Sequence, residues 1–294
     1  MNAPGMILNG RYRLERQIGQ GGSSSVFLAE DILIGKKWAV KFIPCTGKLS
    51  GRLAGNETEL MGTLNHRAFP QIVDAFRTEE GYYIVSDLIK GYDLRSFLRK
   101  ENPPLRQKCL YALKIISALK YLHDRRPPVL YLDLKPDNVM PCDDGELKLI
   151  DFGVAERLME DRKRCGPGER NVSFGTRGYA APEQYTGEAF DKRTDIFSFG
   201  MLFYSMLSLR DPDRDPFRQR RMIRDDGSIP RKIRKIILRC TAPDREDRYK
   251  EVSMIERELR EYLQRPKRRI VLCLIALSLV LQLLALFVIL GRYR

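Results

Sequence analysis

The chain has 294 residues, of which 43% are hydrophobic, and its formal net charge is +14. This length accommodates a two-lobed domain with a large core plus an appendage, and the composition excludes a largely disordered chain. The charge is compatible with nucleic acid, anionic lipid or acidic protein partners. No nucleic-acid motif accompanies it, and basic residues gather beside an apolar C-terminal segment, so we favour a membrane and expect no nucleic-acid partner.

Six cysteines and two histidines limit the metal and redox chemistry. No cysteine stands in a C-x-x-C or other metal-ligand spacing, and two histidines are too few for a metal cluster. We therefore expect reduced thiols in a cytosolic environment. Residues 1–11 form an N-terminal segment, and 1–14 contains no apolar stretch of the kind that a cleaved signal peptide requires.

The first predicted elements form a glycine-containing hairpin. Alternating apolar residues in 11–14 and 26–29 predict two strands, and the sequence GQGG at 19–22 lies between them. Backbone N–H groups of such a hairpin can approach phosphates closely, because glycine has no Cβ in the way. The stretch 38–43 predicts the next strand, and it contains Lys41.

A helix is predicted before Leu64. It contains Glu57 and Glu59, two residues apart. Residues 71–76 and 82–87 then predict two further strands. The first part of the chain is thus a set of strands with one helix.

The following part of the chain is predicted to be mainly helical. A short helix at 94–98 precedes a long amphipathic helix at 105–123, whose apolar residues recur at helical spacing. The stretch 196–209 is apolar on several faces, as a buried central helix should be. Segments 233–240 and 252–263 predict closing helices.

Two stretches between these helices carry the residue types that phosphoryl transfer needs. They are 131–138 (YLDLKPDN) and 149–153 (LIDFG). The reaction requires a carboxylate that orients the attacking hydroxyl, cations that neutralise phosphate charge, and oxygen ligands for Mg²⁺. These groups are supplied within one short window by Asp133, Lys135, Asn138 and Asp151.

These stretches resemble the catalytic loop and the metal-binding Asp-Phe-Gly of protein kinases, and 38–43 resembles the family's Val-Ala-Ile-Lys strand. A further segment, 175–183 (GTRGYAAPE), is similar to the end of the activation segment. The chain is therefore identified as similar to the eukaryotic-like (Hanks-type) Ser/Thr protein kinases. The sequence of 179–185 (YAAPEQY) looks most like that of bacterial members of the family. The tail described below indicates a membrane-anchored kinase.

The resemblance covers about residues 12–264 and implies an α+β, bilobal fold. The N-lobe, at about 12–88, is expected to be a small antiparallel sheet with one helix. The C-lobe, at about 89–264, is expected to be mainly helical. A nucleotide would bind between the two lobes.

The resemblance also implies roles for individual residues, carried over position by position. Asp133 orients the substrate hydroxyl, Lys135 neutralises the γ-phosphate, and Thr176 contacts both. Asn138 and Asp151 hold Mg²⁺, or Mn²⁺ in its place. The residues implied in binding ATP are Ile18, Gly19, Gly21, Val26, Ala39, Lys41, Glu57, Ser86, Asp87, Leu88, Asp93 and Met140.

Three of these assignments carry an alternative or a consequence. Register favours Glu57 over Glu59 as the partner of Lys41, with a solvated helix charge as the competing interpretation. Asp93 contacts the ribose or caps the helix that follows it. Ser86 stands at the gatekeeper position, and its small side chain predicts a pocket behind the adenine.

Several positions depart from the family pattern. Ser24 replaces the third glycine of the hairpin, and Phe197 replaces a tryptophan. Tyr131 and Leu132 replace the His-Arg pair before the catalytic aspartate. We expect Tyr131 to stack on Phe152, so that the core around the metal-binding aspartate survives.

The replacement of arginine by Leu132 has a regulatory consequence. A leucine cannot pair with a phosphorylated activation loop. Ser173 is the one hydroxyl residue in 154–174. We therefore predict that activity does not depend on phosphorylation of this loop, and that Ser173→Ala retains it.

Two contacts are expected to hold the C-lobe together. The resemblance implies that Glu183 forms a buried pair with Arg248. It also implies that Asp195 anchors the backbone of the catalytic loop.

The C-terminal tail contains an uncharged, apolar run of 21 residues at 270–290. A helix of about 20 residues crosses the hydrocarbon core of a bilayer. The basic segment 265–269 has four Lys or Arg residues and the short tail 291–294 has two, which favours a cytoplasmic N-terminal side. We expect a single-pass transmembrane helix with the kinase domain facing the cytoplasm.

Two polar residues lie within that apolar run. Ser278 and Gln282 are four residues apart and share a helix face. Such a face can support a homodimer through interhelical hydrogen bonds. A tolerated polar residue without a partner is the alternative.

The resulting interpretation is an ATP-dependent Ser/Thr protein kinase, tethered to a lipid bilayer by its C-terminus, that phosphorylates protein hydroxyls. A membrane-anchored pseudokinase scaffold is the first alternative. A small-molecule kinase of related fold is the second. The segment 175–183 argues against the latter, because in the family it shapes a platform for protein substrates.

Overall fold

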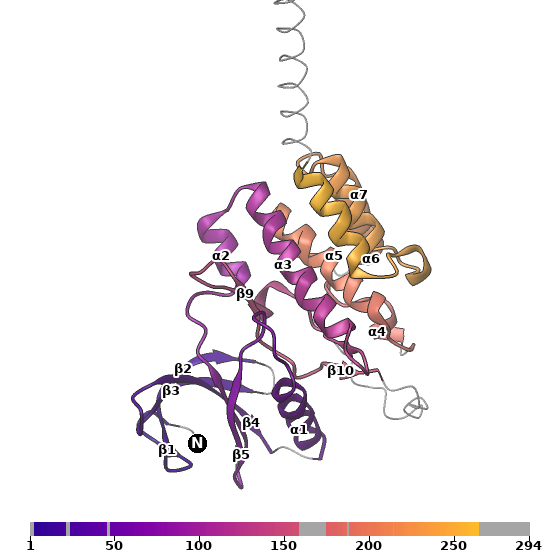
Figure 1. Cartoon of the computed structure of the whole chain (residues 1–294). Coiled ribbons are helices and arrows are strands. Elements are labelled where there is room, and N and C mark those ends of the chain that lie inside the picture. Colours follow the sequence, from indigo (N-terminus) through magenta and orange to yellow (C-terminus); the bar gives the residue numbers. More distant parts are fainter. Residues whose placement is uncertain are drawn as a thin grey trace, which may run out of the picture.

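The computed structural model describes residues 3–21, 24–45, 48–158, 175–186, 188–213 and 215–264. These residues form a sheet-containing N-lobe, indigo to purple in Figure 1, and a helical C-lobe, magenta to yellow. The bilobal arrangement predicted from the sequence is confirmed.

The N-lobe is a six-stranded antiparallel sheet in the order β1-β2-β3-β4-β6-β5. Helix α1 contacts β4, β5 and β6 (Figure 1). The elements are β1 (Ile7–Leu8), β2 (Tyr12–Gln20), β3 (Ser25–Asp31), β4 (Lys37–Pro44), α1 (Lys48–Gly62), β5 (Ile72–Arg77) and β6 (Gly81–Asp87).

Side chains along β4 alternate between the two faces of the sheet, so core residues lie on one face and residues predicted to bind ATP on the other. Trp38 and Val40 are buried in a core that includes Phe27 from β3. Ala39 and Lys41 alternate with them and therefore point to the opposite face of the sheet. This alternation turns Lys41 toward the C-lobe.

The sheet includes a short strand from the N-terminal segment 1–11. This strand, β1, pairs with β2, and its Leu8 is buried. A two-residue strand is too short to produce a periodic pattern, so the sequence gives no signal for it.

The C-lobe is built around two buried helices, α3 and α5 (Figure 1). Helix α3 has the bounds predicted for the amphipathic helix, 105–123. A helix at 252–264 packs its apolar residues into the same core. The remaining bounds are α2 (Leu94–Glu101), α3 (Leu105–His123), α4 (Glu183–Thr186), α5 (Lys192–Ser208), α6 (Pro216–Asp225), α7 (Arg231–Cys240) and the 3₁₀ turn η2 (Arg245–Asp247).

Close packing of α5 on α7 depends on Gly200. A Cβ at this position would lie 2.6 Å from the Cβ of Cys240 and 2.7 Å from the Cγ2 of Thr241. No larger residue fits without moving one of the two helices.

Short strands frame the catalytic loop between the lobes. The loop 131–138 begins after β7 (Val129–Leu130), which pairs with β10 (Glu156–Arg157). It ends in a 3₁₀ turn, η1 (Pro136–Asn138), followed by the hairpin of β8 (Val139–Pro141) and β9 (Leu147–Leu149). A backbone hydrogen bond from Leu149 N–H to Ala68 O (2.8 Å) ties this hairpin to the N-lobe.

Among the residues that the structure describes, none of the helices combines the length and the apolar character needed to cross a bilayer. The predicted span 270–290, its flanking segments 265–269 and 291–294, and the activation-loop residue Ser173 lie outside the described residues. The expectations for them stay predictions.

Candidate active site

The catalytic loop is held by side chains from two helices. The Asp195 carboxylate on α5 accepts the backbone N–H of Tyr131 (2.9 Å) and of Leu132 (2.8 Å). The Gln184 amide on α4 donates to Leu132 O (2.9 Å). These contacts confirm the predicted anchoring by Asp195 and add Gln184 to it.

Leu132 adopts a backbone conformation that leucine rarely takes. It is fully buried, and its φ is +66°. A non-glycine residue in this region is strained and persists only where the surroundings fix it. The two flanking peptide groups are fixed by Asp195 and Gln184, so these side chains determine where Asp133 points.

Aromatic packing fixes the metal-binding segment. Phe152 is buried, with its ring 5.2 Å from the Tyr131 ring and 5.4 Å from the Phe69 ring. The predicted contact between Tyr131 and Phe152 is confirmed, although the rings meet edge to face rather than stacked. Tyr131 thus fills the place of the family's histidine beside Asp151.

The Asp133 carboxylate is held through both oxygens. Its Oδ1 accepts the backbone N–H (3.0 Å) and the hydroxyl (2.8 Å) of Thr176. Its Oδ2 accepts Lys135 Nζ (2.8 Å) and Asn138 Nδ2 (3.0 Å). Lys135 also donates to the Thr176 hydroxyl (2.7 Å), so the predicted contacts of Thr176 are confirmed.

Lys41 lies between two carboxylates. Its Nζ donates to Glu57 Oε1 (2.6 Å) and Oε2 (2.8 Å) and to Asp151 Oδ1 (2.9 Å). Glu59 instead pairs with Arg157 (2.5 Å). The structure therefore pairs Lys41 with Glu57, and the two-residue offset carries Glu59 to a different face of α1.

Opposite charges in this cluster stabilise one another, while burial and the charge of Asp151 raise the pKa of Glu57. Burial alone would lower the pKa of Lys41, but Glu57 and Asp151 raise it above its ordinary value. Burial alone would raise the pKa of Asp151, but Lys41 brings it below its ordinary value. Lys41 is therefore a cation and Asp151 an anion at neutral pH, as phosphate and metal ligands must be.

Two oxygen-bearing side chains are available to a divalent cation. Asn138 turns its Nδ2 toward Asp133, which leaves its Oδ1 for a ligand. Asp151 binds Lys41 and Gly153 N–H through Oδ1, so its Oδ2 is the oxygen that can serve a cation. Among the described residues, no group of three or more His, Cys, Asp or Glu side chains is placed to hold a metal ion. Two protein oxygens suit Mg²⁺, which keeps waters and takes phosphate oxygens as its other ligands.

The strand residues predicted to bind ATP come together on one face of the sheet. Gly19 pairs with Val26, Val26 with Lys41, and Ala39 with Ser86, across β2, β3, β4 and β6. Ile18 and Gly21 lie beside them at the end of β2. The roles of these residues toward a nucleotide stay predictions.

The segment that links the lobes contains the remaining predicted ligands. Asp87 accepts Gln71 N–H (3.0 Å), and Leu88 follows it. Asp93 accepts the backbone N–H and the hydroxyl of Ser96 (both 2.9 Å) and so caps α2. The cap is therefore confirmed, and the contact of Asp93 with a ribose stays a prediction. Met140 lies on β8 and is partly buried.

The segment 175–183 is fixed at its far end by the predicted ion pair. Arg248 donates from Nη1 to Glu183 Oε1 (2.7 Å) and from Nη2 to Oε2 (2.9 Å). Both side chains are buried. The Arg248 guanidinium also lies 4.9 Å from the centre of the Phe197 ring, so phenylalanine supplies the aromatic face at this position.

Two functional contacts have no counterpart in the sequence prediction. Gln184 directly follows the Ala-Pro-Glu motif, but a glutamine at a helix start gives no sign of a partner 52 residues away. Arg95 on α2 donates from Nε (3.1 Å) and Nη2 (2.8 Å) to Asp137 in the catalytic loop. Neither spacing nor periodicity indicates a contact between such distant residues.

A sheet lobe and a helical lobe, with a lysine, two metal-ligand oxygens and a positioned carboxylate at their junction, define the protein-kinase-like class. A family model described as "Protein kinase domain" matches residues 12–267. The chain belongs to the protein kinase family.

Curated bacterial proteins are similar to this chain. The serine/threonine-protein kinase PrkC of Bacillus subtilis is 26% identical over 275 residues, which cover 87% of this chain and 41% of that protein. A probable serine/threonine-protein kinase of Streptomyces coelicolor is 34% identical over 216 residues, 70% of this chain and 31% of that protein. The pkn2 kinase of Myxococcus xanthus is 30% identical over 217 residues, 72% and 26%. The matches thus span between about a quarter and two-fifths of these relatives.

Proposed function

We propose that this protein is an ATP-dependent Ser/Thr protein kinase that phosphorylates hydroxyl groups of protein substrates. The observation that carries the proposal is the network around Asp133. Its carboxylate is oriented through both oxygens by Thr176, Lys135 and Asn138. The bacterial relatives named above support the Ser/Thr class.

In this proposal each side chain has a geometric task. Asp133 accepts a hydrogen bond from the incoming Ser or Thr hydroxyl and takes its proton late in the reaction. Lys135 lies 2.8 Å from that carboxylate and neutralises charge on the transferred phosphoryl group. Lys41, held by Glu57, binds the phosphates that stay with the nucleotide.

Asn138 and Asp151 would hold Mg²⁺, which supplies charge neutralisation to the phosphate oxygens when it is bound. The chain's own contribution is to keep both oxygens fixed. Asn138 is held by Asp133 O (2.9 Å), and Asp151 by Lys41 and Gly153. A cation bound there would favour the ionised form of Asp151 further.

Transfer of labelled phosphate from ATP to a generic protein substrate tests the activity. We expect incorporation on Ser and Thr by the full chain, and its loss in Asp133→Asn and Lys41→Met. Matched controls are Asp143→Asn and Lys37→Met, which make the same chemical changes at exposed positions away from Asp133 and Lys41. Both controls should retain activity.

Two other outcomes identify the alternatives. Nucleotide binding without any transfer by the full chain would indicate a pseudokinase scaffold. Transfer to small hydroxyl compounds but not to proteins would indicate a small-molecule kinase.

We also propose that the protein is anchored in the membrane with its kinase domain in the cytoplasm. The support is the sequence of 270–290, apolar over 21 residues and preceded by four basic residues. Carbonate-washed membranes should retain the full chain. They should lose a chain that ends at residue 264, and loss of the full chain in the same wash contradicts the proposal.

A further inference from the structure

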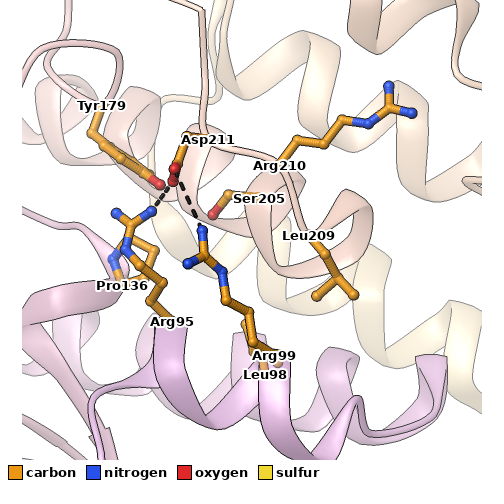
Figure 2. A pocket seen from close by; sticks show the side chains of 9 residues that line it. All are labelled: Arg95, Leu98, Arg99, Pro136, Tyr179, Ser205, Leu209, Arg210 and Asp211. Carbon is orange, nitrogen blue, oxygen red and sulfur yellow. Dashed lines mark ion pairs between the residues drawn. The ribbon is translucent and has the colours of Figure 1, made fainter.

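A small pocket lies beside the catalytic loop, where α2, the end of α5 and the segment 175–183 meet. Figure 2 shows Arg95 and Arg99 of α2 and Tyr179 of that segment directed toward Asp211, which follows α5. The cavity between them is about 20 Å³, enough for one water molecule, so a larger group enters only in the place of one of the lining side chains. None of the residues that line this pocket has a role in the proposed reaction.

Arg95 is the fixed part of the pocket. It binds both oxygens of Asp137 and pairs with Asp211 through its third nitrogen. A guanidinium has five N–H groups, so two of its donors remain after these contacts. Asp137 directly precedes Asn138, so Arg95 also holds the end of the catalytic loop.

Arg99 and Asp211 form the exchangeable part. The distance from Arg99 Nη2 to Asp211 Oδ2 is 3.7 Å, and the two side chains are 62% and 57% exposed. Exposed pairs at such a distance contribute at most about 1 kcal/mol. Asp211 also pairs with Arg95, but water can solvate its carboxylate when it leaves, so another anion can take its place opposite Arg99 at small cost.

Tyr179 is an independent sign of a missing partner. Its side chain is 4% exposed, and its hydroxyl has no hydrogen-bond partner at ordinary geometry among the described residues. Burial raises the pKa of this phenol, against a lowering by nearby Ser205 and Arg95, so it is a neutral donor at physiological pH. A buried hydroxyl aimed at a polar cavity costs free energy until an acceptor fills it.

Two short connections, one through hydrogen bonds and one along the catalytic loop, join the pocket to the catalytic carboxylate. Tyr179 N–H binds Thr176 O (3.0 Å), and Thr176 in turn binds Asp133. Asp137 lies four residues after Asp133 in the same loop. A peptide whose hydroxyl lies at Asp133 therefore passes close to this pocket.

We propose that the pocket is a substrate-selecting site for an anionic side chain, carboxylate or phosphate, a few residues from the phosphorylated hydroxyl. Arg99 and the Tyr179 hydroxyl bind the anion, Arg95 supports them, and Asp211 moves aside. The inference rests on the proposed kinase activity. It states which proteins that activity prefers.

Peptide arrays phosphorylated by the full chain test the site. Each array places Asp, Glu, phosphoserine, Ala or Lys at one position around a fixed Thr. We expect one position at which the acids raise kcat/KM at least about threefold over Ala, as a solvent-accessible ion pair allows. Comparing Asp and Glu with phosphoserine distinguishes a carboxylate site from a phosphate site.

Charge reversal identifies the residue responsible. Arg99→Glu should shift the preference at that position from acids to Lys, and Asp211→Asn should strengthen the preference for acids. The matched control is Lys100→Glu on the same helix, whose ammonium lies 5.0 Å from the Tyr92 ring rather than in the pocket. This control should keep the wild-type preference.

Two results would overturn the site. One is an array without acid preference in a chain that phosphorylates the Thr. The other is an equal loss of acid preference in Arg99→Glu and Lys100→Glu, which would indicate general attraction by a basic surface. Absence of phosphorylation on every peptide refutes the kinase proposal instead, so the two failures are distinguishable.

Discussion

Two arginine–carboxylate groups flank the segment 175–183, and they differ in solvent access. Arg248 and Glu183 are 0% and 5% exposed and meet through two parallel hydrogen bonds. Arg95 and Asp137 make the same bidentate contact but are 24% and 47% exposed. The chemistry is identical, and only the surroundings differ.

The comparison separates a structural ion pair from one suited to recognition. A buried partner cannot leave without stranding the opposite charge in a low-dielectric interior, so the first pair holds the fold. The second group is partly solvated, so the neighbouring pair of Arg99 and Asp211 can exchange its anion at small cost while Arg95 stays bound to Asp137. The predictions below test this difference, beginning with the largest effect.

Arg248→Met should be the most damaging of these changes. It leaves the Glu183 carboxylate buried without its partner, which typically costs about 3–5 kcal/mol. Urea unfolding followed by helical circular dichroism measures the loss. The double variant Arg248→Met, Glu183→Gln should lose less, because the stranded charge is gone, and equal stability of Arg248→Met and the wild type would contradict the comparison.

Gly175→Ala should disturb the same segment through its backbone. The φ of Gly175 is +96°, and an added Cβ would lie 2.9 Å from Ala180 Cβ and from Gln184 Nε2. We expect a loss of about 1–3 kcal/mol in the free energy of unfolding, with a fall in kcat because Thr176 moves from Asp133. Gly145→Ala is the control: its φ is +78°, but no atom lies within 4 Å of the added Cβ.

The buried pair should also give a specific acid dependence. Burial raises the pKa of Glu183, but Arg248 outweighs it, so the folded pKa lies below the ordinary 4.5. Its stabilising contribution is therefore complete above about pH 4.5 and is lost as pH falls through the folded pKa, with a slope of at most about 1.4 kcal/mol per pH unit. Stability measured against pH in Glu183→Gln should lack this component, and an unchanged profile counts against it.

Arg95→Gln should have the smallest effect on stability. Its pair with Asp137 is partly solvated, so we expect a loss of at most about 1 kcal/mol in the free energy of unfolding. The difference between variant and wild type should shrink at high salt, because ions screen such pairs. A loss as large as that of Arg248→Met would show that the two groups are equivalent after all.

Long periodic elements were predictable from the sequence. Helix α3 has the predicted bounds because a 19-residue amphipathic pattern is unambiguous. The strand β1, the hairpin of β8 and β9, and helix α6 were not predicted. The three strands have two or three residues each, which is too short to show a period, and α6 is mostly polar, with four arginines among its ten residues.

Contacts within the active site were predictable where a motif fixes the spacing. The pairs of Glu183 with Arg248 and of Asp195 with the loop backbone follow from such motifs. The positive φ of Leu132 and the contact between Arg95 and Asp137 do not. Both depend on which side chains the tertiary fold brings close together. A local sequence pattern cannot predict such contacts.

The ion pair between Lys41 and Glu57 has a consequence for nucleotide binding. It joins β4 to α1, while buried Phe152 keeps Asp151 beside the same lysine. Under the proposed function, the lysine and the aspartate are held in place before a nucleotide arrives, so little side-chain entropy is lost when it binds.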